Sequence, residues 1–122
     1  MDILVTNNQL VQAQFQSSVE VEYSDINLLG VLTKVRDLIH KGHRLLTHPL
    51  SGSVKPNETL YKTVLITEAK DGTDTQSVTI IEESIKTAQK FPPKQIPEQF
   101  KHDMQVVDLS LIRTALGASF TK

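Results

Sequence analysis

A polar stretch from Thr47 to Tyr61 contains most of the side chains in this sequence whose types and spacing could do chemistry. It reads THPLSGSVKPNETLY, and this density of proline, glycine, serine and asparagine is typical of an irregular loop. Glycine lets a ligand approach the backbone closely, serine donates a hydroxyl and lysine supplies a positive charge, which together suit a carboxylate or a phosphate. We therefore predict ligand-binding residues in this loop: His48, Ser51, Gly52, Ser53, Lys55, Asn57 and Glu58.

The loop carries no complete catalytic motif. It lacks the GKS or GKT ending of a phosphate-binding P-loop, the GxGxxG of a dinucleotide site and the GxSxG elbow of a serine hydrolase. A small enzyme could use His48 as its base and Lys55 as its cation, with Glu58 to orient the imidazole. A rigid surface loop whose polar groups satisfy one another is the alternative to a ligand site. We therefore assign no catalytic residue.

The composition excludes several other kinds of site. The chain has no cysteine, which rules out disulfides, thiolate metal sites and thiol redox chemistry. The histidines show no HExxH-type spacing, so we predict no metal site, and no motif requires a cofactor. The net charge of −1 provides no field that would attract nucleic acid or an anionic membrane. Because no signal-peptide pattern and no membrane-length apolar run is present, we expect a cytoplasmic protein.

Hydrophobic periodicity predicts the elements that must position the loop. Apolar or alternating runs predict strands at residues 3–5, 19–23, 43–47 and 63–67, the second nearer an edge of the sheet. Apolar residues at helical spacing predict helices at residues 9–16, 25–41 and 75–91. Pro97-Glu98 is a usable helix start for a segment through Phe100. Residues 104–107 suggest a last strand before a helix at 109–116 capped by Asp108, and a single long helix is the rival interpretation.

The alternation of strands and helices predicts one α/β domain over residues 1–122. We expect a three-layer sandwich with a mostly parallel central sheet of four or five strands, either Rossmann-like or flavodoxin-like. The carboxyl ends of parallel strands share one edge of such a sheet, and ligands bind there. We therefore expect Thr6, Asn7 and Asn8, which follow the first strand, to border one crevice with the 47–61 loop.

Three stretches of the chain resemble the GrdX family: HKGHRLLTHPLSGSVKPNETLYKTVLI, VTNN near the start and VVDLSLI near the end. The resemblance implies a cytoplasmic protein encoded beside the components of glycine, sarcosine and betaine reductases in amino-acid-fermenting bacteria, without an assigned reaction. A chain that lacks cysteine cannot be a thiol redox centre of such a reductase. The resemblance thus implies an accessory protein that binds a small anionic or amino-acid-like metabolite or a reductase subunit. An enzyme acting on a reductase substrate or acyl phosphate through His48 and Lys55, and a homo-oligomeric scaffold, are the alternatives.

Overall fold

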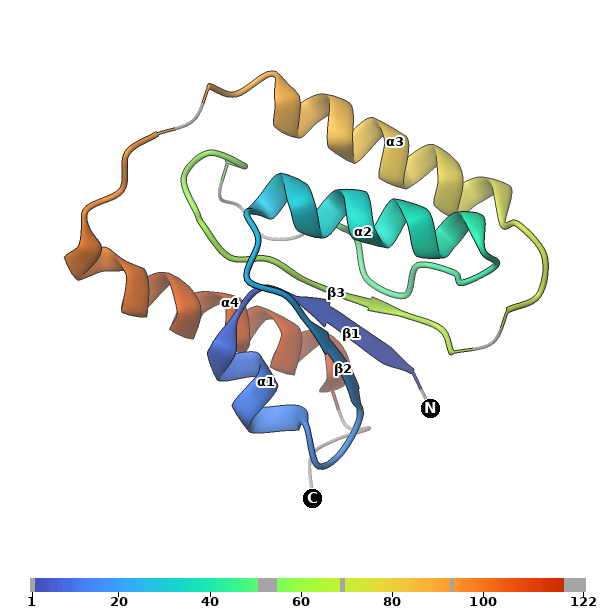
Figure 1. Cartoon of the computed structure of the whole chain (residues 1–122), viewed down its shortest axis with the longest axis horizontal. Coiled ribbons are helices and arrows are strands. Elements are labelled where there is room, and N and C mark those ends of the chain that lie inside the picture. The colour runs from blue at the N-terminus through green and yellow to red at the C-terminus, as the bar shows by residue number, and fades with distance from the viewer. Residues whose placement is uncertain (1, 51–54, 69, 93, 118–122) are drawn as a thin grey trace.

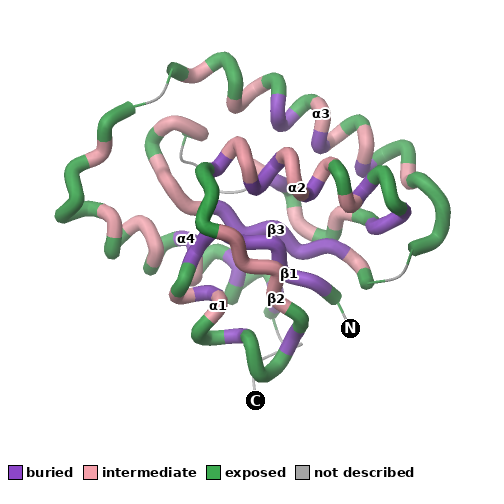
Figure 2. Tube along the Cα trace, viewed as in Figure 1, coloured by how far each residue is buried: buried purple, intermediate pink, exposed green. Residues whose placement is uncertain are grey.

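The fold is built on a small mixed β-sheet, shown in Figure 1. The computed structural model describes residues 2–50, 55–68, 70–92 and 94–117. The strands β1 (Ile3–Thr6), β2 (Glu20–Tyr23) and β3 (Thr63–Ile66) lie in the order β2-β1-β3. The central strand β1 pairs in parallel with β2 and antiparallel with β3. Every residue of β1 and β3 is buried because helices cover both faces of the sheet, whereas β2 is a half-exposed edge strand, as predicted (Figure 2).

The predicted fold class is therefore wrong. Three strands form a mixed sheet, not the mostly parallel sheet of four or five strands that a Rossmann-like or flavodoxin-like sandwich requires. The expected strand at residues 43–47 makes one isolated bridge, from Leu45 to Ile66. It does not extend into a ladder because the Leu45 N–H donates to the side chain of Ser77, at 3.0 Å, and the Leu65 N–H donates to the Thr47 hydroxyl, at 2.9 Å.

Within the ranges that the structure describes, four α-helices cover the two faces of the sheet. The helices α2 (Leu28–His40) and α3 (Thr75–Gln89) pack together and share a hydrophobic core with Ile3, Val5, Val64 and Ile66. On the opposite face, α1 (Gln9–Phe15) and α4 (Lys101–Leu116) pack around Leu4 and Leu65. Successive side chains of a strand point to opposite faces of the sheet, so alternate strand residues belong to two separate hydrophobic cores. The predicted helices at 9–16, 25–41 and 75–91 are confirmed, with ends displaced by a few residues at most.

Residues 101–116 form one long helix, which confirms the rival interpretation and corrects the predicted strand at 104–107. A short 3₁₀ turn, Glu98–Phe100, leads into α4, so the expected helix start at Pro97-Glu98 is confirmed. Asp108 is not a cap but a buried residue in the middle of α4. It shares a helical face with Ile112 and Leu116, at intervals of four residues, and this face packs on the sheet. The β-branched Val106 and Val107 suggested a strand, but tertiary packing overrides so weak a propensity.

The antiparallel direction of β3 decides which part of the 47–61 loop lies near the end of β1. Thr6, the last residue of β1, is opposite Thr63, the first residue of β3. The exit of the 47–61 loop therefore meets Asn7. The predicted parallel strand at residues 43–47 would instead have placed the entrance of this loop beside Asn7. Within the described ranges, no helix has the length and apolar character needed to cross a membrane.

Candidate functional site

Asn7 joins three segments that are distant in the sequence. Its side-chain nitrogen donates to the carbonyl oxygens of Ile26 and Leu60, both at 2.8 Å. Its side-chain oxygen accepts from the backbone N–H of Lys62 at 2.9 Å. Both amide hydrogens are used in these contacts, so Asn7 holds the loop exit against β1 and has no donor left for a ligand.

A second buried network surrounds the Asp108 carboxylate. One oxygen of Asp108 accepts from the Thr63 hydroxyl at 2.7 Å and from the Asn8 side-chain nitrogen at 3.0 Å. Thr63 gives its only hydroxyl hydrogen to Asp108, so the 2.7 Å contact between the Thr6 and Thr63 hydroxyls has Thr6 as its donor. The Thr6 oxygen in turn accepts from the Asn8 N–H at 3.0 Å. All four residues are buried, and charge-assisted hydrogen bonds hold the carboxylate in one orientation.

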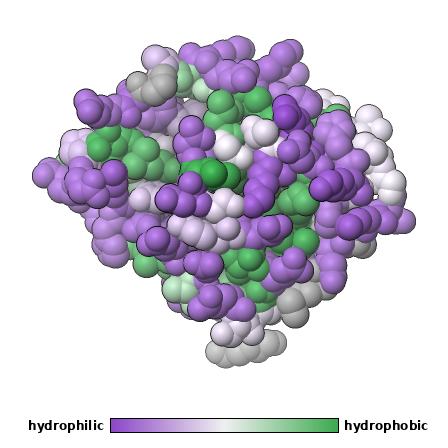
Figure 3. Space-filling model, viewed as in Figure 1, coloured by the Kyte–Doolittle hydropathy of each residue, from purple (hydrophilic) through white to green (hydrophobic). Residues whose placement is uncertain are grey.

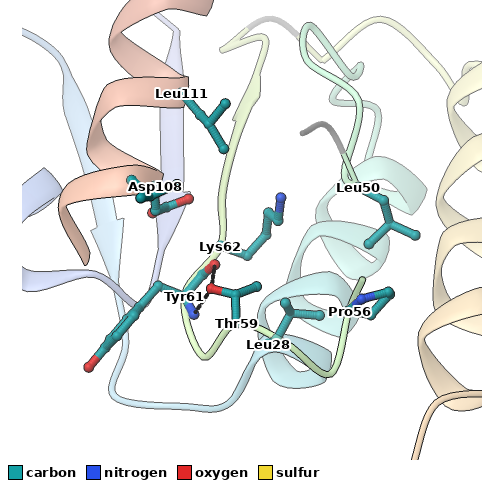
Figure 4. Close-up of a pocket in the computed structure, with 9 residues that line it drawn as sticks. Leu28, Leu50, Pro56, Thr59, Tyr61, Lys62, Asp108 and Leu111 are labelled. Atoms are coloured by element: carbon teal, nitrogen blue, oxygen red, sulfur yellow. Dashed lines mark hydrogen bonds between the residues drawn. The ribbon is translucent and has the colours of Figure 1, made fainter. Parts of the chain in front are cut away.

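Lys62 brings an amine into the same region. The residue is 6% exposed, and its side chain extends toward Leu50 into a small cavity that Leu111 and Asp108 of α4 also line (Figure 4). Burial lowers the pKa of Lys62, and the attraction of the Asp108 carboxylate opposes this effect only in part. The cavity volume of about 30 Å³ has room for one or two water molecules.

A larger cavity of about 320 Å³ adjoins this one and lies between the N-terminal end of α2, the loop exit and the segment after α3. Its polar side chains include Asn57 and Lys94. The side-chain nitrogen of Asn57 donates to the Pro92 carbonyl at 2.7 Å, whereas its side-chain oxygen is buried and has no hydrogen-bond partner among the described residues. Lys94 forms an exposed ion pair with Glu58, with 3.4 Å between nitrogen and oxygen.

The N-terminus of α2 forms one wall of the larger cavity, through Asn27, Leu28 and Leu29. Asn27 caps the helix by accepting from the Gly30 N–H at 2.7 Å. The first N–H groups of a helix have no partner within the helix, and the helix dipole adds partial positive charge there. This wall is therefore suited to a negatively charged group.

The predicted ligand-binding residues fall into separate environments. Thr6, Asn7 and Asn8 belong to the buried networks, whereas Asn57 lines the larger cavity and the adjacent Glu58 is paired with Lys94 of the same lining. Lys55 is exposed. Three further predicted residues lie outside the described part of the chain: Ser51, Gly52 and Ser53.

His48, the predicted base of the enzyme alternative, is exposed and lies against α3. Its Nδ1 accepts from the Leu50 N–H at 3.0 Å, which closes a local turn. With Thr79 and Glu83 it borders a shallow depression that is distinct from the cavities at the loop exit. The enzyme alternative with His48 and Lys55 stays a prediction without a described contact that links the two side chains.

Sequence reasoning missed Lys62, Lys94 and Asp108. Two signals were present: Lys62 directly precedes the apolar strand TVLI, and Asp108 interrupts the apolar run VVDLSLI. A charged residue inside an apolar run is almost never fully buried unless it is paired. The interruption at 108 could therefore have indicated a buried polar contact, but it could not have named Thr63 and Asn8 as the partners.

In the described part of the chain, these features define a fold in which four α-helices enclose a three-stranded mixed sheet, with a buried carboxylate network beside a cavity of metabolite size. The chain belongs to the GrdX-like protein family, whose model matches residues 3–117, and the resemblance seen in the sequence is thereby confirmed. Searches among curated proteins and among solved structures found no match.

Proposed function

We propose that this protein is a noncatalytic accessory protein of the glycine reductase system that binds a small amino-acid-like metabolite in the cavity beside Asn57. The observation that carries the proposal is the buried side-chain oxygen of Asn57, which has no partner among the described residues. An unpaired buried acceptor costs about 1–3 kcal/mol, so a ligand N–H that pairs with it gains binding energy. The link to the glycine reductase system rests on what the resemblance to the GrdX family implies.

Groups of both signs at the cavity suit a zwitterion: the N-terminus of α2 and Lys94 are positive, and Glu58, the ion-pair partner of Lys94, is negative. The carboxylate of the ligand would lie against the N-terminus of α2, with Lys94 as a nearby cation. Its ammonium group would donate to the Asn57 oxygen, and Glu58 would add a favourable field. A volume of about 320 Å³ is at the lower end of the range for ligand pockets, which favours a molecule the size of an amino acid.

A thermal-shift titration tests the proposal. We expect glycine and sarcosine to raise the melting temperature, because a ligand at 100 times its Kd stabilises the fold by about 2.7 kcal/mol. The Asn57→Ala variant should lose most of this shift, whereas Lys41→Met, at the opposite end of α2, should keep it. Betaine carries no N–H, so any shift it produces should not depend on Asn57. An equal response of wild type and Asn57→Ala to glycine would refute this ligand geometry.

Docking onto a reductase subunit is the second candidate, favoured by an exposed apolar stripe along α4. The stripe consists of Phe100, Met104, Val107 and Leu111, which recur at intervals of four, three and four residues. Met104 is half-buried, and the other three are exposed. Phe100 is 46% exposed and Val107 is 50% exposed. Apolar groups at this spacing form one helical face, the kind of surface that partner proteins cover. On the side of the molecule that Figure 3 shows, hydrophilic side chains separate the apolar patches.

A further inference from the structure

A groove of about 260 Å³ lies beside the first turns of α4, which begins at the left end of the molecule in Figure 1. Two segments line the groove, namely the start of α4 with the turn before it and the loop exit. Their lining residues are Phe100, Asp103, Met104, Val107, Glu58 and Thr59. Three of these side chains belong to the apolar stripe, and two others are carboxylates. The groove therefore combines apolar surface with negative charge.

Asp103 carries a charge that no described residue compensates, since it makes no hydrogen bond or ion pair with any of them. The nearby lysines have other partners. Lys94 pairs with Glu58 at 3.4 Å, and Lys101 pairs with Glu98 at 2.8 Å. The helix N-terminus stabilises an aspartate in the first turn, but it would do so equally for an aspartate on a face without a groove. One negative charge beside apolar surface is thus left for a partner.

The spacing of the chain puts this charge on the apolar stripe itself. Phe100, Asp103 and Val107 are separated by three and four residues, which is the spacing of one helical face. Phe100 and Val107 are exposed, so a group bound beside Asp103 would contact an open aromatic ring and an aliphatic side chain. A long side chain that ends in a cation matches this surface, because its stem covers apolar groups while its charge reaches the carboxylate.

We propose that this groove binds an arginine side chain of a partner protein. The inference rests on the docking candidate above and names its chemical anchor. The guanidinium would stack on the Phe100 ring and donate to Asp103, with Glu58 as a second acceptor, because the exposed pair of Glu58 with Lys94 is weak. Arginine is preferred to lysine because an ammonium has neither the planar face nor the fork of donors. Apolar neighbours of the arginine would cover the rest of the stripe.

Methyl NMR of the full chain tests the proposal. The chain has two methionines, Met1 and Met104, so isotope labelling of methionine methyl groups gives one signal from the groove, assigned with a Met104→Leu variant. The probes are blocked tripeptides, acetyl-Leu-Xaa-Leu-amide, in which Xaa is arginine, lysine or citrulline. We expect the arginine peptide to shift the Met104 signal and to bind about fivefold tighter than the citrulline peptide, which has a similar shape without the charge. No shift, or equal affinities for these two peptides, would overturn the proposal.

Substitutions in the groove separate the charge from the ring. Asp103→Asn keeps the shape and removes the charge, and we expect it to weaken the arginine peptide about fivefold without affecting the citrulline peptide. Glu20→Gln removes an exposed carboxylate on β2 and should leave both affinities unchanged. Phe100→Leu keeps an apolar side chain but removes the ring, so it should reduce the preference for arginine over lysine. An Asp103→Asn protein that binds the arginine peptide as tightly as the wild type would rule out this anchor.

Two further measurements distinguish a docking surface from a metabolite site. Acetyl-arginine-amide has the guanidinium but no apolar neighbours, and we expect it to bind at least about fivefold more weakly than the tripeptide. Equal binding would identify a site for a small guanidino compound and overturn the proposal. In co-purification with the reductase components, Asp103→Asn should reduce the recovery of a subunit and Glu20→Gln should not. Recovery that depends on Val107 but not on Asp103 would keep the docking candidate and overturn the arginine anchor. Binding of the arginine peptide without recovery of any subunit would keep the anchor and remove the reductase as the partner.

Discussion

Adjacent asparagines at the end of β1 connect the sheet to different parts of the chain. Asn7 bonds to the backbone of Ile26, Leu60 and Lys62, whereas Asn8 bonds to Asp108 and caps α1 through Leu10. Both were predicted from the sequence as ligand-binding residues. Their amide hydrogens are instead used within the protein, so the polar character of this segment serves to position the loop exit and α4.

Thr63 should be the most sensitive hydroxyl of the buried network. A Thr63→Val substitution keeps the shape but removes the donor to the Asp108 carboxylate and the acceptor for Thr6. We expect a loss of about 1.5–3 kcal/mol in the free energy of unfolding, measured by urea denaturation, because the carboxylate is left short of one charge-assisted hydrogen bond. The exposed Thr79→Val, which loses a bond to the Thr75 carbonyl, should change stability by about 0.5 kcal/mol or less. Equal losses in the two variants would mean that the network adds nothing to stability.

At the scale of elements, the end of α2 is held close to the turn before α3. Gly42 follows the C-cap of α2 with φ of +109°, and its carbonyl accepts from the Asp71 N–H at 3.2 Å. A Cβ at Gly42 would lie 3.2 Å from that nitrogen and 3.3 Å from the Cα of Lys70. Backbone therefore contacts backbone here, and only glycine fits both the conformation and the space.

Alanine at Gly42 and at Gly72 separates conformational strain from close approach. Both glycines have positive φ, but nothing lies within 4 Å of a Cβ at Gly72. We expect Gly72→Ala to cost about 1 kcal/mol from strain alone. Gly42→Ala should cost about 2–3 kcal/mol, because the α2 end must also move away from the turn. Thermal unfolding monitored by circular dichroism measures both, and a Gly72→Ala loss as large as that of Gly42→Ala would contradict the packing argument.

The whole molecule presents the apolar stripe of α4 on a surface that no other described element covers. Neighbouring helical residues point about 100° apart, so Val106 lies off the stripe although its exposure of 44% is close to the 50% of Val107. The two valines are therefore matched probes of one helix. Substituting each valine in turn distinguishes a docking face along the stripe from an effect of apolar surface anywhere on α4.

Co-purification from cells that express the reductase components tests docking. We expect Val107→Asp to reduce recovery of a reductase subunit about tenfold or more, because a charge is buried unpaired in the interface. Val106→Asp should leave recovery unchanged. A wild-type pull-down that contains no reductase subunit would remove the docking candidate, and equal losses in the two variants would show that the stripe is not the contact.

The sequence by itself determined the local elements and the family. Periodicity located three helices, because an apolar stripe is set by residues only three or four positions apart. Nearly the whole chain matches the family model, so the quoted motifs were sufficient for recognition. In the candidate site, Asn57 and Glu58 could be proposed from loop composition alone.

Only the tertiary structure decided the directions of the strands in the sheet and the burial of the charged side chains beside it. Whether β3 runs antiparallel to β1, and whether residues 43–47 form a ladder, depends on contacts such as Leu45 with Ser77, which lie 32 positions apart in the sequence. The same long-range packing buries Lys62 near Asp108, 46 positions away by their numbers, and lowers the pKa of Lys62. Burial and pairing are properties of residues brought together by the fold, so composition and spacing could not reveal them.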